Sequence, residues 1–263
     1  MSFDYFSGIS RLYGNKTLQQ FQNSHVAVVG VGGVGSWAVE ALARSGIGSI
    51  TLIDLDEICV TNINRQLHAT HDSIGRLKVK VMAQRIAAIN PKAIVHIKQT
   101  FYSESNAHEL LDQSFDVVID AIDTVRQKCH LIATCRQLGI GVVTCGAAGG
   151  RRDPSRIGVD DLARTHDDAL LQQTRKRLRS DHGFPAAGSG NKAKKFHVTA
   201  VFSTEPPVFP QCDGTVSQSR PSDAPLRLSC ESGYGTATPV TATFGMIAAS
   251  RALELLESRS STP

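Results

Sequence analysis

A glycine-rich turn is the first feature of this sequence that could do chemistry. It follows the apolar stretch HVAVV with the spacing G-x-G-x-x-G, and its glycines are Gly30, Gly32 and Gly35. In a strand–turn–helix unit the first glycine permits a tight turn, the second lets a phosphate approach the backbone, and the third lets the helix pack on the strand. The helix N-terminus then presents free N–H groups to an anion. The loop, which also contains Gly33, therefore predicts a site for nucleotide phosphates.

An acidic residue ends the next apolar stretch, SITLID, at Asp54. In dinucleotide-binding proteins a carboxylate at this place accepts hydrogen bonds from the ribose hydroxyls. The glycine loop and Asp54 alone therefore make NAD the expected ligand, and residues farther along the chain decide whether another nucleotide fits better.

The polar residues after Asp54 favour a triphosphate over NAD. The loop TNINRQ carries Arg65, and Lys78 follows in GRLKVKV. Arginine binds phosphate oxygens bidentately and lysine acts as a point charge, whereas an NAD site has little use for either beyond the ribose. The other polar side chains of this loop are Asn62, Asn64 and Gln66.

Two acidic residues, Asp120 and Asp123, lie at the end of the apolar stretch DVVIDAI and just beyond it. Open α/β sheets bind ligands outside the carboxyl ends of their strands. A carboxylate there can hold Mg²⁺, which bridges one or two acids to phosphates. The glycine loop, Asp54, Arg65, Lys78 and Asp123 together therefore predict an ATP–Mg²⁺ site.

These side chains need a sheet whose strand ends meet at one edge. Short apolar stretches alternate with stretches of helical spacing, which predicts an α/β fold: a Rossmann-like, doubly wound, mainly parallel sheet covered on both faces. The expected strands are 25–29, 49–54, 93–99, 116–122 and 141–148, and the expected helices are 34–44, 75–90, 103–113 and 126–139.

We expect a single adenylating domain over residues 1–263. Residues 20–150 form its nucleotide-binding half, and residues 151–263 form a C-terminal extension of the same domain, with a strand at 196–204 and a terminal helix. Glycine, serine and proline are frequent in two other segments, which predicts loops there. The expected loops are 183–195 and 211–238.

The composition is that of an ordinary globular protein, with 263 residues and a formal charge of +4. Six cysteines form no C-x-x-C pair, and no basic region followed by an apolar stretch opens the chain. We expect free thiols and a cytoplasmic location. The apolar part of TPVTATFGMIAASRALELLE is shorter than the roughly 20 residues that cross a bilayer, so we expect no membrane association.

Basic residues gather in the C-terminal half. The cluster consists of Arg175, Lys176, Arg177 and Arg179 in one stretch and Lys192, Lys194 and Lys195 in the next. Between 175 and 195 the only acid is Asp181. Such clusters suit a nucleic-acid backbone, because each neutralised phosphate releases counterions. An acidic protein partner would also suit this charge.

The motifs GVGGVGS, LIDLD followed by TNINRQ, the lysine at 78 and DAID at 120–123 resemble the ubiquitin-activating-enzyme-like superfamily. Its bacterial members include the adenylyltransferases of molybdopterin and thiamine biosynthesis, which adenylate a carboxylate with ATP. The resemblance implies that the ribose is bound by Asp54, the phosphates by Asn62, Arg65 and Lys78, and Mg²⁺ by Asp123. We also place Gln66 in the nucleotide site.

The same resemblance gives a role to Arg11 in SRLYGNK. It implies that Arg11 reaches the active site of a partner subunit, where an arginine finger stabilises charge on the reacting phosphates. A homodimer is then part of the mechanism.

Further motifs resemble one branch, the tRNA threonylcarbamoyladenosine dehydratases, over nearly the whole chain. They are RLYG, DAIDTVRQK, RLRSDHGF, VFSTEPPVFPQCDGT and GYGTATPVTATFG. The branch implies a tRNA substrate whose carboxylate is adenylated with ATP. A nitrogen of the same substrate then closes a ring, and AMP and pyrophosphate are released. No catalytic cysteine is required.

The sequence departs from the sulfur-carrier adenylyltransferases, many of which have two C-x-x-C pairs and an asparagine where this chain has Thr124. An adenylyltransferase for a ubiquitin-like sulfur carrier is still the second hypothesis, and a nucleotide-dependent module that delivers sulfur or docks a desulfurase is the third. Cys212 and Cys230 are the cysteines to consider for covalent chemistry. A monovalent cation, and a cysteine desulfurase or sulfur-acceptor protein as partner, stay open.

Overall fold

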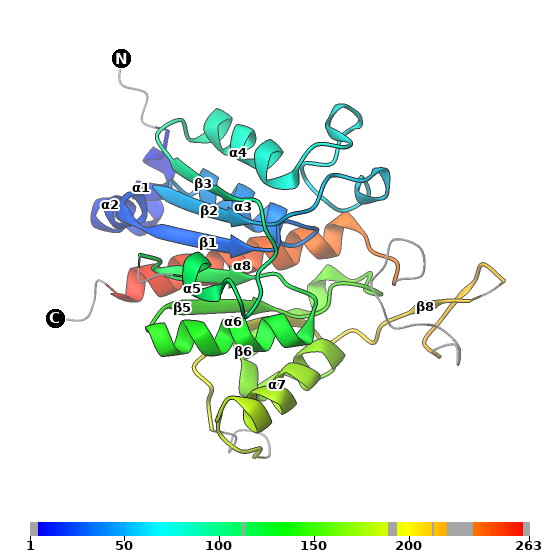
Figure 1. The fold of residues 1–263 in the computed structure, drawn as a ribbon. Coiled ribbons are helices and arrows are strands. Elements are labelled where there is room, and N and C mark those ends of the chain that lie inside the picture. The colour runs from blue at the N-terminus through cyan, green and yellow to red at the C-terminus, as the bar shows by residue number, and fades with distance from the viewer. Residues whose placement is uncertain (1–4, 112–113, 189–193, 212, 220–233, 260–263) are drawn as a thin grey trace.

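Seven strands form one sheet in the spatial order β3-β2-β1-β4-β5-β7-β6 (Figure 1). Neighbouring strands run parallel except β6, which is antiparallel to β7. The computed structural model describes residues 5–111, 114–188, 194–211, 213–219 and 234–259. The strands are β1 His25–Val29, β2 Ser49–Ile53, β3 Ile94–Lys98, β4 Val117–Asp120, β5 Gly141–Cys145, β6 Ile157–Asp161 and β7 Thr199–Ser203.

Helices cover both faces of this sheet (Figure 1). One face carries α3 Gly35–Arg44, α4 Lys78–Ile89 and α8 Thr238–Arg259, and the other carries α5 Ala107–Leu110, α6 Val125–Leu138 and α7 Ala169–Asp181. Two further helices, α1 Ser7–Tyr13 and α2 Asn15–Asn23, precede β1. The predicted α/β, Rossmann-like, mainly parallel fold is confirmed.

Strand β1 shows why the sheet needs cover on both sides. Val26 and Val28 belong to the core beneath α3 and α8, while Ala27 and Val29 belong to the core beneath α6. Successive side chains of a strand point to opposite faces, so a continuous apolar run is what a strand buried on both faces requires. The sequence HVAVV meets that requirement.

The C-terminal helix α8 packs tightly against α3. A side chain at Gly245 would place its Cβ 2.5 Å from the carbonyl oxygen of Val34 and 2.7 Å from Cβ of Trp37. Only glycine allows this approach, which brings the start of α8 against the glycine-rich turn that precedes α3. Helix α8 therefore helps to form the end of the sheet that carries the glycine-rich turn.

The order of the strands reverses beside β1. Val26 of β1 pairs with Ile50 of β2 on one side and with Val117 of β4 on the other. The connections leaving β1 and β4 therefore diverge to opposite faces of the sheet. A crevice outside the carboxyl ends of these strands is where open α/β sheets bind their ligands.

Several predicted elements differ in extent. The helix expected at 103–113 is the four-residue α5, and residues 112 and 113 lie outside the described part. Strand β6 was not predicted, because its sequence IGVDD is mostly polar and it lies at the edge of the sheet. The helices α1 and α2 were not predicted either.

The two segments expected as loops are described only in part. The described residues of 183–195 form neither helix nor strand, and Lys192 lies outside them. In the second segment the expectation of loop throughout was wrong, because Val216–Ser217 (β9) pairs with Phe209–Pro210 (β8). Cys212 and Cys230 lie outside the described residues. Among the helices that are described, none is long and apolar enough to cross a membrane.

Candidate active site

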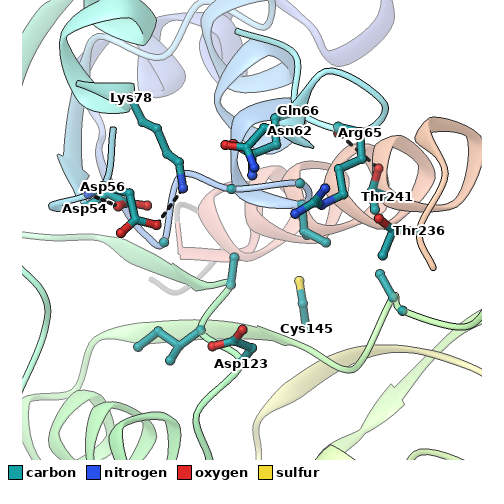
Figure 2. A pocket seen from close by; sticks show the side chains of 18 of the residues that line it. Asp54, Asp56, Asn62, Arg65, Gln66, Lys78, Asp123, Cys145, Thr236 and Thr241 are labelled. Atoms are coloured by element: carbon teal, nitrogen blue, oxygen red, sulfur yellow. Dashed lines mark hydrogen bonds and ion pairs between the residues drawn. The ribbon is translucent and has the colours of Figure 1, made fainter. Parts of the chain in front are cut away.

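A cavity of about 990 Å³ opens at the carboxyl edge of the sheet (Figure 2). Its walls come from the residues that follow β1, β2, β3, β4 and β5, and from the segment that leads into α8. The cavity therefore lies at the point where the strand order reverses. Of the residues predicted to bind the nucleotide, those that line it are Gly30, Gly32, Gly33, Asp54, Asn62, Arg65, Gln66, Lys78 and Asp123.

The glycine-rich turn has the geometry that its spacing predicts. Gly30 has a φ of +87°, and a Cβ on Gly35 would meet the carbonyl oxygen of Gly30 at 1.9 Å. Gly35 therefore allows α3 to start directly above the turn and does not itself line the cavity. Within the described residues, the backbone N–H groups of Gly32, Gly33 and Val34 donate to no acceptor. These unpaired donors at a helix N-terminus favour an anion.

Asp54 holds the turn in place. Its carboxylate accepts hydrogen bonds from the backbone N–H of Val31 at 2.6 Å and of Asp56 at 2.9 Å. Burial raises the pKa of Asp54, and these two donors act against that rise. A carboxylate has about four acceptor positions, so Asp54 still has capacity for the hydroxyls of a ribose.

His68 holds the next peptide group of the same turn. Its Nε2 lies 2.9 Å from the carbonyl oxygen of Val31, so this nitrogen carries the proton and donates it. Burial lowers the pKa of His68 to about 4, and the ring is therefore neutral near pH 7. His68 does not line the cavity, which makes it a support of the turn and not a ligand of the nucleotide.

Lys78, the first residue of α4, directs its ammonium group to the cavity and pairs with Asp56 at 2.6 Å (Figure 2). The lysine side chain is only 7% exposed, whereas that of Asp56 is 50% exposed. A buried ammonium needs a partner, and Asp56 provides one when no phosphate is present. Asp56 was not predicted as a site residue from the sequence, although its place two residues after Asp54 was a signal.

The loop after β2 presents the remaining polar groups. The guanidinium of Arg65 donates to the carbonyl oxygen of Thr61 at 2.7 Å and to Asn64 Oδ1 at 3.1 Å. The side-chain oxygen of Asn62 accepts from the backbone N–H of Cys59 at 3.0 Å. Gln66 Oε1 is buried and has no hydrogen-bond partner among the described residues. All three side chains line the cavity, and their remaining donors are available to phosphate oxygens.

Helix α8 is hydrogen-bonded to the loop after β2. Thr241 Oγ1 donates to the carbonyl oxygen of Arg65 at 3.2 Å, and Trp37 Nε1 of α3 donates to the same oxygen at 3.1 Å. Thr238 Oγ1 donates to the carbonyl oxygen of Asn64 at 2.7 Å. The backbone that carries the Arg65 side chain is therefore held by residues that lie 174 and 176 positions later in the chain.

The two acids of DAID have different surroundings. Asp120 is fully buried, where Lys128 Nζ lies 2.7 Å from its carboxylate and the Thr144 hydroxyl donates to it at 2.6 Å. Asp123 is exposed at the cavity wall, where its carboxylate accepts a hydrogen bond from the hydroxyl of Thr124 at 3.3 Å. Of these two acids, only Asp123 has a carboxylate open to a cation. In the described part of the chain no three His, Cys, Asp or Glu side chains form a metal cluster.

The loop after β5 forms a wall that the sequence analysis did not assign to the site. Cys145 ends β5 and lines the cavity together with Gly146, Ala147, Ala148 and Gly149. Burial raises the pKa of Cys145 to about 12, so its thiol is not a nucleophile near neutral pH. Residues 234–236, which precede α8, complete this wall.

Arg11 is exposed on α1, outside the cavity of its own chain. Figure 1 shows α1 and α2 at the end of the sheet opposite the carboxyl edge. The backbone agrees, because the N–H of Ser49, the first residue of β2, donates to the carbonyl oxygen of Ser24, directly after α2. Within one chain Arg11 does not take part in the cavity.

Only some side chains of the basic cluster are free of contacts within the chain. Arg175 donates to the hydroxyl of Thr165, and Arg177 pairs with Asp181 at 3.0 Å. Arg179 stacks over the ring of Phe196, with its guanidinium carbon 5.1 Å from the ring centroid. The exposed members among the described residues are Lys176, Lys194 and Lys195.

Comparison with known proteins matches residues 7–262 to the ThiF family. A tRNA threonylcarbamoyladenosine dehydratase of Escherichia coli strain K12 is 51% identical over 250 residues, covering 95% of this chain and 92% of that protein. A protein of the same name from Haemophilus influenzae is 48% identical and covers the same shares. A crystal structure of the E. coli enzyme in complex with ATP superposes with a TM-score of 0.85 at 46% identity, covering 98% of this chain and 95% of the other.

Proposed function

This chain belongs to the ThiF family, and we propose that it is an ATP-dependent dehydratase of threonylcarbamoyladenosine in tRNA. One observation carries this proposal: the cavity at the strand-order reversal brings free backbone N–H groups together with Arg65, Lys78 and Asp123. The similarity to two dehydratases, over 95% of the chain in each case, supplies the substrate.

The carboxylate of the threonylcarbamoyl group is a poor electrophile until one of its oxygens becomes a leaving group. It attacks the α-phosphorus of ATP, pyrophosphate leaves, and an acyl-adenylate forms. The ureido nitrogen of the same substrate then attacks the acyl carbon. AMP leaves with one oxygen of the former carboxylate, the ring closes, and the nucleoside has lost one water.

The residues of this chain position the phosphates and neutralise their charge. The free N–H groups of Gly32 and Gly33 offer donors that need no reorganisation during the reaction. The ammonium of Lys78 adds a positive charge, which exchanges Asp56 for a phosphate when the nucleotide binds. Arg65 offers further donors from the loop after β2. The ribose is assigned to Asp54, whose carboxylate is already held by two backbone donors. Asn62 and Gln66 complete the nucleotide site.

Asp123 is proposed as the Mg²⁺ ligand. Mg²⁺ is commonly held by one or two carboxylates and by substrate phosphates, and the exposed carboxylate of Asp123 at the cavity wall fits that donor set. When bound, the ion would supply charge neutralisation at the phosphates. A monovalent cation in the C-terminal loops stays a prediction, because most of the segment 211–238 lies outside the described residues.

Arg11 is proposed to act in the cavity of a partner subunit of a homodimer. Its place supports this proposal, because it is exposed and lies at the other end of its own sheet. A guanidinium contributed from a second subunit would add charge at the phosphates where the described residues leave the cavity open.

The exposed lysines near α7 are proposed to contact the tRNA backbone. Lys176, Lys194 and Lys195 have their ammonium groups available, whereas Arg175, Arg177 and Arg179 already make contacts within the chain. We place this protein in the cytoplasm, where its tRNA substrate is found. A cysteine desulfurase or sulfur-acceptor protein as a further partner stays a prediction.

The test uses tRNA bearing threonylcarbamoyladenosine, incubated with the protein, Mg²⁺ and ATP, then digested and analysed by mass spectrometry. The proposal expects the nucleoside to lose one water only when ATP is present. An unchanged nucleoside, together with ATP–pyrophosphate exchange that depends on a ubiquitin-like sulfur carrier, would instead support a sulfur-carrier adenylyltransferase.

A further inference from the structure

The cavity extends well beyond the residues assigned to ATP. It reaches from Asp54, after β2, to Cys145 at the end of β5. Two strands, β1 and β4, lie between β2 and β5, so the two ends are three strand spacings apart, roughly 14 Å. The adenosine is assigned to the β2 end and the phosphates to the turn after β1. The wall after β5 therefore remains for the second reactant.

We propose that this wall is the subsite for the modified nucleoside and that Tyr234 stacks on its base. We name it the nucleoside compartment and define it as the part of the cavity lined by residues 145–149, Leu170 and residues 234–236. The inference rests on the proposed function and adds to it the place at which the substrate base is held.

The ring of Tyr234 is held in the wall from two sides. It packs against Phe209 with ring centroids 5.2 Å apart and an angle of 45° between the planes. A Cβ at Gly150 would lie 2.9 Å from Cδ1 of Tyr234, so the absence of a side chain at 150 is what lets the ring lie there. A preordered aromatic ring binds a base at a low entropic cost.

Backbone hydrogen bonds tie this wall together. The N–H of Gly150 donates to the carbonyl oxygen of Gly235 at 2.8 Å, and the N–H of Val208 donates to the carbonyl oxygen of Gly150 at 2.9 Å. Residue 150 thus joins the strand that carries Phe209 to the segment that carries Tyr234. The compartment is built by contacts between three distant parts of the sequence.

Asp168 fixes the other side of the compartment. One oxygen of its buried carboxylate accepts from the N–H of Ala147 at 2.9 Å, and the other accepts from the N–H of Leu171 at 2.9 Å. A Cβ at Gly146 would lie 2.2 Å from that carboxylate. The N–H groups of Ala148 and Gly149 have no acceptor among the described residues, and they remain available to the carbonyl and carboxylate oxygens of a substrate.

The chemistry of this wall suits an unstacked base from a single-stranded loop. Such bases are commonly bound by stacking on aromatic side chains. The basic surface adjoins the compartment, because Leu170 lies in the first turn of α7 and Lys176 lies six residues later. This separation is roughly 9 Å of helix. A tRNA backbone on that surface can therefore deliver one base to Tyr234.

The experiment measures KM for tRNA bearing threonylcarbamoyladenosine and KM for ATP in the wild type, Tyr234→Leu and Tyr234→Phe. Tyr234→Leu removes the stacking interaction with the base, so it should raise the KM for tRNA about 10-fold or more. Its KM for ATP should stay within about 2-fold of the wild type. Tyr234→Phe keeps the ring and should behave as the wild type. Thermal unfolding with saturating ATP checks that each variant is folded.

Three results would overturn the inference while leaving the proposed function intact. They are an unchanged KM for tRNA in Tyr234→Leu, an equal rise in KM for ATP, or a loss in Tyr234→Phe as large as in Tyr234→Leu. An inactive wild type would contradict the proposed function itself, so the two failures are distinguishable.

Discussion

The ammonium of Lys78 lies 2.6 Å from the carboxylate of Asp56, and both residues line the cavity. The acid and the nucleotide phosphates therefore compete for one buried cation. We expect Lys78→Met to weaken ATP binding about 10-fold or more, because a charged hydrogen bond to phosphate is lost.

The matched variant is Asp56→Asn, which removes the competing charge but keeps a hydrogen-bond acceptor near Lys78. It should bind ATP as tightly as the wild type or more tightly, as measured by calorimetric titration. If Asp56→Asn instead weakened ATP binding as much as Lys78→Met does, Asp56 would be a residue that positions Lys78 and not its competitor.

The neutral His68 makes the glycine-rich turn sensitive to acid. Burial lowers its pKa to about 4, below the ordinary value, so the native state binds fewer protons than the unfolded state. Its stabilising contribution is complete above about pH 6.5 and is lost as the pH falls toward 4. Between pH 7.5 and pH 5 the free energy of unfolding should fall by about 2 kcal/mol through this group.

His68→Gln supplies the control for that pH dependence, since its amide can still donate to the carbonyl oxygen of Val31. Urea unfolding of both proteins at the two pH values isolates the histidine from the other titrating groups. An equal fall in stability for the wild type and His68→Gln would show that His68 does not carry the effect.

Replacing one member of the buried ion pair of Asp120 and Lys128 should strongly destabilise the protein. Both side chains are fully buried, and their charged groups lie 2.7 Å apart. Lys128→Met leaves an unpaired buried carboxylate and should lower the free energy of unfolding by about 3–5 kcal/mol. The double variant Asp120→Asn with Lys128→Met should recover part of that loss.

An exposed ion pair that also uses a residue of α6 serves as the control. Arg126 lies 2.9 Å from Glu104, and both side chains are largely exposed. Arg126→Met should change stability little, because exposed pairs are weak. Equal losses for Arg126→Met and Lys128→Met in urea unfolding would contradict this account of burial.

The homodimer proposal gives a complementation test. Arg11→Ala and Asp123→Ala should each be inactive, because every active site in either homodimer lacks one group. In mixed dimers one site contains both native residues, so activity should return to about a quarter of the wild-type level with equal mixing of subunits. Activity is measured as AMP release that depends on the modified tRNA. No recovery, with mixed dimers shown to form, would contradict the role of Arg11 in the partner subunit.

Local spacing predicted several residues that line the cavity, because each of them belongs to a single element. The glycine loop, Asp54 and Lys78 each lie directly at the end of a strand or the start of a helix, and the structure brings them to one cavity. The fold class was predictable too, because the alternation of apolar stretches with stretches of helical spacing is also a local pattern. Their assigned roles in binding stay predictions.

The residues that the sequence did not reveal depend on contacts between distant segments. Tyr234 can line the cavity because Gly150, far away in the sequence, has no side chain to displace its ring. Cys145 has the sequence pattern of an ordinary core residue, and only the folded loop after β5 shows that it lines the cavity. Charge counts also could not show that Arg179 is occupied within the chain, since Phe196 meets it only in the folded protein. The pair of Arg177 and Asp181 is different, because its i,i+4 spacing on one helix could have indicated it. The edge strand β6 lacks the apolar alternation that identifies the central strands.

The central claim is that the substrate carboxylate attacks the α-phosphorus of ATP. The most direct measurement places oxygen-18 in the carboxylate of threonylcarbamoyladenosine in tRNA and analyses the released nucleotides by mass spectrometry after one turnover. Attack at the α-phosphorus predicts one labelled oxygen in AMP and none in pyrophosphate. Label in inorganic phosphate with release of ADP, or label lost only to water, would contradict the acyl-adenylate.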